Sequence, residues 1–326
     1  MKKIMTIIVF CFFVTTAYAE DNEIVVFRVG YLPLLSQLPI VVSYENDRLN
    51  LKKIQVELIK FKSCTSIEAA LRVGAIHAAN VSIPIVLSIA SEMYDCKICN
   101  IKVVGVIQKG GTLLVAREQL NLNDFRGKLI GVPGLDSVET FTLMNIMQEN
   151  GLNFGLDYKA IGITYDSAIE DLKTDKLQAF YLPEPWGSIA EKEAGAFSID
   201  AQTFSIDQPT TLLILSKEFM ENNTEAVAEW IESIFNACLF IENDINKTGA
   251  RQTAIIQKKY FNFSNDLVID SLANRKGAIG FAPSLPDMDH IKSILTKATE
   301  IKWIMKSVPF DQIIDTAVME KLIKQP

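Results

Sequence analysis

The chain has 326 residues, with 32 Lys and Arg against 39 Asp and Glu, so its formal net charge at pH 7 is −7. No segment is strongly basic. This argues against nucleic acid as a partner, because such binding depends on Lys and Arg side chains that neutralise phosphates. The length exceeds the usual size of a single domain, so two lobes are expected.

The N-terminus has the pattern of a secretion signal. Lys2 and Lys3 form a basic start, an apolar stretch runs from Ile4 to Val14, and small residues precede a cleavage position after Ala19. The apolar stretch is shorter than the roughly 20 residues that a membrane span requires. We therefore expect residues 1–19 to be a signal peptide that is removed on export to the periplasm. Loss of its two lysines changes the formal net charge from −7 to −9.

After the signal, strand-like and helix-like segments alternate. Alternating apolar residues indicate strands, and a capping residue before an apolar run indicates a helix. The segments expected first are strands over Val25–Tyr31, Ile54–Lys62, Ile76–Val81 and Ile101–Ile107, and helices over Leu38–Arg48, Thr65–Val73 and Ile83–Ser91. This order predicts an α/β fold with a parallel sheet and helices on both of its faces.

A second series of the same kind begins after Gly110. Its expected strands are Leu113–Ala116, Lys128–Val132, Tyr158–Thr164 and Leu177–Leu182, and its expected helices are Asp136–Glu149, Ser167–Lys173 and Ser188–Ala194. One more strand, over Thr210–Ser216, precedes a helical C-terminal part. The helices expected there are Thr224–Glu242, Ala250–Tyr260, Ser264–Ala273, Asp287–Ala298 and Asp311–Ile323.

One arrangement explains this order of segments. The chain crosses from a first lobe to a second near Gly111 and returns near Pro209, which makes a hinge of two strands. We expect the first lobe to comprise residues 20–111 and 209–326, and the second lobe to comprise residues 112–208. Ligands of open α/β sheets bind outside the carboxyl ends of the strands, so a ligand cleft is expected between the lobes.

Four loops follow strands and lead into helices on the two lobes. They are Leu32–Leu38, Asn80–Pro84, Pro133–Ser137 and Pro183–Gly187. Each presents a helix N-terminus, where unpaired backbone N–H groups and a partial positive charge suit an acceptor-rich ligand. Ordinary strand-to-helix turns have the same pattern, so it is the repetition of the loops on both lobes that indicates a site.

Two of these loops carry acidic residues. Asp136 or Ser137 can cap the helix that follows, with Glu139 completing a capping box, and Ser137 can also donate to a ligand. Glu184 lies between two prolines beside Trp186, which suits a cationic or N–H-rich ligand, although a surface acid and a packing indole have the same pattern. None of the four loops contains Lys or Arg. A neutral or zwitterionic organic ligand reconciles these features.

Catalytic and metal-binding patterns are not found. A nucleophile needs a base within hydrogen-bond reach, and the two histidines, His77 and His290, lie in a predicted strand and a predicted late helix. Neither has a ligand-like spacing to a cysteine, so no metal site and no cofactor are expected. The pair Cys96 and Cys99 favours a local disulfide in an oxidising compartment, with two free thiols as the alternative.

The ordered segments GYLPLLSQLPIVVS, SIEAALRVGAIHAANVSIPIVL, GKLIGVPGLDSVET and YLPEPWGSIA resemble the nitrate, sulfonate, taurine and thiamine-precursor group of periplasmic binding proteins. The resemblance implies a type II periplasmic binding protein fold, with the cleft between two lobes, and a partnership with the membrane permease of an ABC importer. The pocket residues that it implies are Leu34, Ser36, Gln37, Asn80, Ser82, Gly111, Thr112, Asp136, Ser137, Glu184 and Trp186.

The chain departs from parts of this group. Nitrate- and bicarbonate-type relatives often carry Asp-His where this chain has Ser36 and Gln37, and the cysteine-rich motif of thiamine-precursor synthases is absent. These differences argue against an oxyanion ligand, a bound metal and a synthase activity. The expected function is capture of a small organic solute, of the sulfonate, nitrate or heterocycle type, by a monomer that closes its two lobes.

Two other functions share these sequence features. One is an enzyme on the same fold, like those of a menaquinone pathway or of thiamine-precursor synthesis, which would turn over the molecule that it binds. The other is a ligand sensor that docks on a membrane receptor. The signal peptide favours an exported binding protein over the enzyme, because the enzymes of the menaquinone pathway are usually cytoplasmic.

We predict that the exported protein begins at Glu20 and contains a Cys96–Cys99 disulfide. Its intact mass should equal that of residues 20–326 less two hydrogen atoms, because the bridge removes one hydrogen from each thiol. Thiol labelling of the denatured, unreduced protein should modify Cys64 and Cys238 alone. A retained signal or a lipid adduct would disprove the cleavage, and labelling of four cysteines would disprove the bridge.

Overall fold

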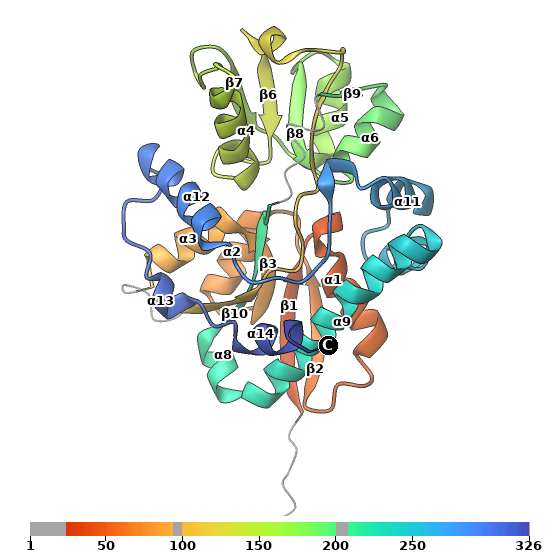
Figure 1. Cartoon of the computed structure of the whole chain (residues 1–326), viewed down its shortest axis with the longest axis vertical. Helices are drawn as coiled ribbons and strands as arrows, with labels where there is room; N and C mark the ends of the chain where they lie inside the picture. Colours follow the sequence, from red (N-terminus) through yellow and green to blue (C-terminus); the bar gives the residue numbers. More distant parts are fainter. Residues whose placement is uncertain (1–23, 94–99, 200–207, 326) are drawn as a thin grey trace, which may run out of the picture.

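The computed structural model describes residues 24–93, 100–199 and 208–325. The predicted signal peptide and the Cys96–Cys99 pair lie outside the described residues. The described chain forms two five-stranded sheets, each with helices on both faces, and the two lobes stand end to end in Figure 1. No helix in the described ranges is both long and apolar enough to cross a membrane.

The sheet of the first lobe has the strand order β2-β1-β3-β10-β4. Its strands are β1 (Val25–Tyr31), β2 (Ile54–Lys60), β3 (Ala78–Ser82), β4 (Ile101–Gly105) and β10 (Thr211–Ser216). Strand β1 pairs in parallel with β2 and β3, whereas β10 enters antiparallel between β3 and β4. The strand that returns from the second lobe is therefore central in the first sheet, which ties the two parts of the first lobe together.

Helices cover both faces of this sheet. They are η1 (Leu35–Gln37), α1 (Leu38–Asp47), α2 (Cys64–Arg72), α3 (Ile83–Ser91), α8 (Lys217–Asn222), α9 (Thr224–Thr248), α10 (Arg251–Lys258), α11 (Asn265–Ala273), η4 (Lys276–Ala278), α12 (Met288–Glu300), α13 (Phe310–Ile313) and α14 (Ala317–Ile323). Helices α1, α9, α10 and α14 enclose one apolar core, and α2, α3 and α12 enclose the other. Burial on both faces explains why the inner strands β3 and β10 are buried at nearly every position, whereas the edge strand β2 alternates buried apolar and exposed polar residues.

The second lobe repeats this plan on a smaller scale, with the strand order β7-β6-β8-β5-β9. Its elements are β5 (Thr112–Ala116), η3 (Leu122–Phe125), β6 (Leu129–Val132), α4 (Val138–Glu149), β7 (Lys159–Gly162), α5 (Tyr165–Lys173), β8 (Ala179–Pro183), α6 (Trp186–Ala194) and β9 (Phe197–Ser198). Helix α4 packs on one face of the sheet, and α5 and α6 pack on the other.

Two connections run between the lobes and pair with each other. Gly110 N donates to Gln208 O at 2.9 Å, and Lys109 forms a β-bridge with Pro209. A third segment lies against them, because Lys109 and Gly280 exchange two backbone hydrogen bonds. Gly277 approaches so closely that a Cβ atom there would lie 2.7 Å from the backbone of Thr112, and its φ of 62° also favours glycine. The hinge is therefore backed by the segment that follows α11.

Most of the predicted elements are present, with two corrections at the C-terminal end. The single helix expected over Asp311–Ile323 is wrong. The chain is extended at Ile314, which bridges to Val103 of the edge strand β4, and helices α13 and α14 lie on either side of that break. The helix expected to stop at Glu242 continues to Thr248, where Gly249 ends it with a φ of 70°. The short elements β9 and α8 were not expected.

The core contact of α9 generates a stability prediction. Ile241 is fully buried and Leu239, on the same helix, is 42% exposed. Replacing Ile241 by Ala should lower the free energy of unfolding by about 2–5 kcal/mol, because it leaves a cavity in the core. Leu239→Ala should change it by only about 0.5 kcal/mol. Urea unfolding of both variants tests this. Equal losses in the free energy of unfolding for the two variants would show that Ile241 does not lie on the buried face of α9.

Candidate functional site

A cavity of about 700 Å³ lies between the lobes, at the carboxyl ends of strands from both sheets. We call it the cleft. The segments that line it are 32–37, 60–65, 80–85, 110–111, 133–139, 163–166 and 210–211, together with single residues that include Glu68 and Trp186. Its volume is within the range of about 300–1,000 Å³ that is typical of small-molecule sites. A cavity large enough for a small molecule therefore lies where the sequence predicts the ligand cleft.

In the first lobe, a pair of buried amides forms part of the cleft wall. Gln37 Nε2 donates to Asn80 O at 3.0 Å, and Asn80 Nδ2 donates to Ser36 O at 3.2 Å. Both acceptors are backbone carbonyls, which cannot donate, so the two amide groups can only point their NH2 ends at them. The oxygens Gln37 Oε1 and Asn80 Oδ1 are buried and have no hydrogen-bond partner. These two oxygens are free to accept hydrogen bonds from a ligand.

The start of α4 forms part of the cleft wall in the second lobe. Ser137 is the N-cap, because its hydroxyl accepts a hydrogen bond from Thr140 N at 3.2 Å. Asp136 is exposed and does not cap the helix. Glu139 is buried on the inner face of the first turn, and burial raises its pKa to about 6, although hydrogen bonds to its own backbone and to Ser137 offset part of that rise. Its side chain belongs to the cleft, not to a capping box.

Aromatic rings line another part of the cleft. The ring of Trp186 stacks on Tyr165 with a centroid separation of 5.7 Å and an angle of 8° between planes, and Phe263 meets it edge-on at 6.3 Å. Trp186 Nε1 is buried without a hydrogen-bond partner. The indole is therefore fixed by its neighbours, and its N–H is a free donor.

Glu184 has a different position from the one its sequence context suggested. Its side chain is 1% exposed and is not part of the cleft lining. The carboxylate accepts hydrogen bonds from Ser188 N at 3.0 Å and from Ser188 Oγ at 2.7 Å. It therefore occupies the start of α6, where a carboxylate is stabilised by the unpaired amides of the first turn. These two hydrogen bonds explain the buried position of the Glu184 carboxylate, and no ligand is needed to explain it.

The same group lies at the junction of the two lobes. Ser271 Oγ on α11 donates to Ser188 Oγ on α6 at 2.9 Å, and Leu35 N donates to Glu184 O at 3.1 Å. On the same side an ion pair joins Lys276 to Glu191 of α6, and on the other side of the cleft Phe141 of α4 packs against Trp303. The lobes are therefore in direct contact on both sides of the cleft.

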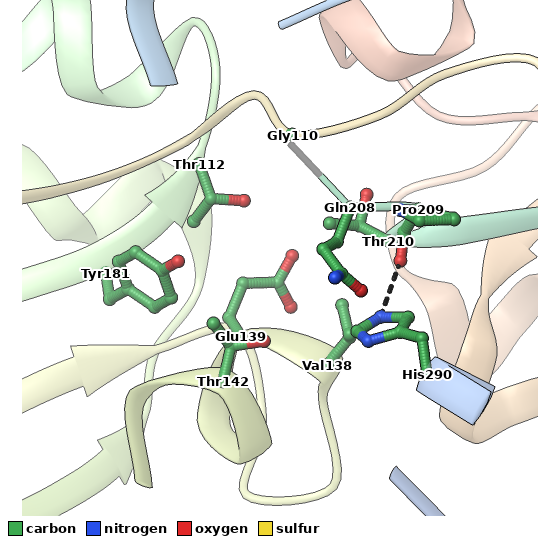
Figure 2. A pocket seen from close by; sticks show the side chains of 10 residues that line it. All are labelled: Gly110, Thr112, Val138, Glu139, Thr142, Tyr181, Gln208, Pro209, Thr210 and His290. Carbon is green, nitrogen blue, oxygen red and sulfur yellow. Dashed lines mark hydrogen bonds between the residues drawn. The ribbon is translucent and has the colours of Figure 1, made fainter. Parts of the chain in front are cut away.

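A much smaller cavity, of about 10 Å³, lies behind the cleft at the hinge. Figure 2 shows Glu139 and Gln208 facing each other across it, with His290 beside them. His290 Nε2 lies 3.0 Å from Pro209 O, so the imidazole is tied to the returning connection. Glu139 lines both cavities, which places its carboxylate between the cleft and the hinge.

Nine of the eleven pocket residues expected from the sequence line the cleft. They are Leu34, Ser36, Gln37, Asn80, Ser82, Gly111, Asp136, Ser137 and Trp186. Thr112 lines the small hinge cavity instead, and Glu184 lines neither cavity. Residues not predicted as part of the pocket include Phe61, Cys64, Glu68, Glu139, Tyr165 and Asp166. Tyr165 and Asp166 begin the helix that follows β7. The pattern of a strand, a loop and a helix that identified the other four loops could therefore have identified them.

The histidine and cysteine side chains considered as catalytic groups occupy buried or remote positions in the described chain. His77 lies far from the cleft, where it accepts a hydrogen bond from Arg28 N at 3.2 Å and stacks on Phe219. Burial is the main reason that the pKa of the Cys64 thiol rises to about 12, so this cysteine is not a thiolate nucleophile at neutral pH. No cluster of three or more His, Cys, Asp or Glu suited to a metal ion occurs among the described residues.

Comparisons with known proteins agree with this architecture. A family model described as the NMT1-like family matches residues 20–256. No curated protein sequence matches the chain. The fold is similar to that of the ligand-binding component of an ABC-type import system from Staphylococcus aureus, solved with zinc bound (17% identity, TM-score 0.76, covering 91% of this chain and 98% of that one).

Two further solved structures have the same fold. The periplasmic nitrate-binding protein NrtA from Synechocystis PCC 6803 is 12% identical, with a TM-score of 0.77 over 93% of this chain and 90% of that one. The periplasmic aliphatic sulphonate-binding protein SsuA from Escherichia coli is 16% identical, with a TM-score of 0.72 over 89% and 97%. These likenesses confirm the predicted fold of two α/β lobes.

Glu184 generates a prediction for the dependence of stability on pH. Burial raises its pKa from the usual 4.5 to about 7. The folded state therefore binds more protons than the unfolded chain between these values, so stability is greatest below the window and falls as pH rises through it. As pH rises through this window, the free energy of unfolding of Glu184→Gln should fall less than that of the wild type. The difference between the two falls should be on the order of 1–3 kcal/mol. Urea unfolding at several pH values tests this.

The exposed acid Glu170 of the same lobe provides the matched control. Glu170→Gln should leave the slope of stability against pH unchanged. Glu139, whose pKa is raised to about 6, contributes to the same fall, so some slope should persist in Glu184→Gln. A slope in Glu184→Gln as steep as that of the wild type would contradict the buried, raised-pKa state of this carboxyl.

Proposed function

Because the chain belongs to the NMT1-like family, we propose that it is the periplasmic solute-binding component of an ABC importer, which captures a small organic molecule by closing two lobes on it. The lobes of this proposal are residues 20–111 with 209–326, and residues 112–208. The solved proteins of the same fold include a ligand-binding component of an import system and two periplasmic binding proteins, which supports the proposal.

One observation carries the proposal. Three buried polar atoms without hydrogen-bond partners belong to side chains that line the same cleft: Gln37 Oε1 and Asn80 Oδ1 from the first lobe and Trp186 Nε1 from the second. An unpaired buried polar atom costs about 1–3 kcal/mol, so each requires a partner. A ligand bonded to both lobes would supply these partners and favour the closed form over an open one.

The contacts between the lobes fit closure of rigid bodies about a hinge. The connections near Gly110 and Gln208 pair with each other, so they constrain the direction of the motion. The contacts across the cleft rim include the hydrogen bond between Ser271 and Ser188, the ion pair between Lys276 and Glu191 and the packing of Phe141 on Trp303, which can break and re-form. A ligand released into a membrane permease requires such reversible contacts.

The geometry supports binding more than turnover. A raised thiol pKa removes Cys64 as a nucleophile, and neither His77 nor His290 lines the cleft. Among the described residues, Glu139 forms no ion pair with a histidine or a lysine that could act with it as a catalytic pair. We therefore propose that the bound molecule leaves the cleft chemically unchanged.

Asn80 provides the test of this function. Asn80→Ala removes one unpartnered acceptor and should weaken ligand binding by roughly 5- to 150-fold. Protein purified without refolding should carry a bound small molecule in native mass spectrometry, and Asn80→Ala should lose most of that occupancy. Asn222→Ala, at an exposed position far from the cleft lining, should keep it. A wild type that never carries a ligand, or a variant with full occupancy, would contradict the proposal.

A further inference from the structure

We infer that the cleft recognises an organic cation, a solute with a protonated amine, amidine or guanidine group that pairs with Glu139. This inference rests on the proposed function and narrows its substrate class. Glu139 is 9% exposed, lines the cleft and forms no ion pair with a Lys, Arg or His of the described residues. A buried carboxylate without a positive partner is costly, and a cationic ligand would supply that partner.

The acceptors of the first lobe point to the same chemistry. Backbone carbonyls fix the amides of Gln37 and Asn80 so that Oε1 and Oδ1, not the NH2 groups, are unpartnered. Both side chains are 1% exposed. A nitrate ion or a sulfonate group has no hydrogen to donate to these atoms, whereas an amine or amidine has several. Three acceptors from two lobes therefore require a ligand rich in N–H groups.

The distribution of charge in the cleft also favours a cation. Four acidic residues line it: Glu68, Asp136, Glu139 and Asp166. After burial, the next causes of the raised pKa of the Cys64 thiol are the charges of Glu139, Asp136 and Glu68, so the field at this point of the wall is negative. Burial, and then Cys64 and Glu139, likewise raise the pKa of Tyr165.

Basic side chains do not balance these acids. The two basic residues in the lining, Lys60 and Lys62, are both exposed, and Lys60 Nζ donates to Tyr260 O at 2.9 Å. Glu68 is paired with Arg72, and the other three acids of the lining form no ion pair among the described residues. Asp136 and Asp166 are exposed to water, so Glu139 is the buried acid of the lining that lacks a positive partner. The stacked ring of Trp186 adds an aromatic face, which also attracts cations.

The cleft also contains a few donors. Trp186 Nε1 is unpartnered, and the start of α3 carries no side-chain cap. An acceptor elsewhere in the same ligand can bind these groups, so a zwitterion whose positive end meets Glu139 belongs to the inferred class. A simple anion does not, because it would place its charge among the unpaired acids.

The experiment separates the ligand class from the function. A small-molecule extract of the source cells and their medium is divided by ion exchange into cationic, unretained and anionic fractions. Each fraction is added to the purified, ligand-free protein, and the midpoint of thermal unfolding is measured. We expect the cationic fraction to raise the midpoint. Glu139→Gln should need about 30-fold more of that fraction for the same response, because one partner of a buried charge pair is removed.

Glu149→Gln is the matched control, since Glu149 is exposed at the other end of the same helix. It should respond as the wild type does. A response to the anionic fraction alone, or a response to the unretained fraction that Glu139→Gln does not diminish, would overturn the inferred class and leave the proposed function intact. A response to the unretained fraction that Glu139→Gln does diminish would identify a zwitterion of the inferred class. An undiminished response of Glu139→Gln to the cationic fraction would remove Glu139 from recognition. The absence of a response to any fraction would count against the proposed function itself.

Discussion

Pairing of buried polar groups is the constraint on which this structure depends. At the junction between the lobes, side-chain groups find partners inside the protein, as Glu184 does with Ser188. In the cleft wall, the same rule fixes the amides of Gln37 and Asn80 through their NH2 groups and leaves their oxygens unpaired. In the proposed function, a ligand in the cleft pairs with these two oxygens.

The two buried carboxylates of the second lobe show how one chemical group takes two roles. Glu184 sits at the start of α6, where a serine and a backbone amide satisfy it, and it helps to hold the lobes together. Glu139 is the second residue of α4, in its first turn, and lines the cleft. Burial raises the pKa of both, yet only Glu139 is placed to meet a ligand.

The architecture links recognition to motion. The cleft is lined from both sheets, and the segments that close it are held by a hinge whose connections pair near Gly110 and Gln208. Side chains of α4 reach the first lobe, where Val138 and Phe141 join its apolar core. A ligand that pairs with groups on both lobes therefore acts on the same interface that α4 and α6 already form.

The sequence by itself determined the order of strands and helices, the two lobes and the loops that line the cleft, because apolar periodicity and helix-capping residues are local properties of the chain. It placed Gln37, Asn80, Ser137 and Trp186 in the cleft correctly. Only the tertiary structure decided which acid faces the cleft. Glu184 is bonded to Ser188, which in turn meets Ser271, 83 residues further along the chain, and no local pattern reveals such a partner. The orientation of the Gln37 and Asn80 amides was decided in the same way, by carbonyls that are 43 and 44 residues away.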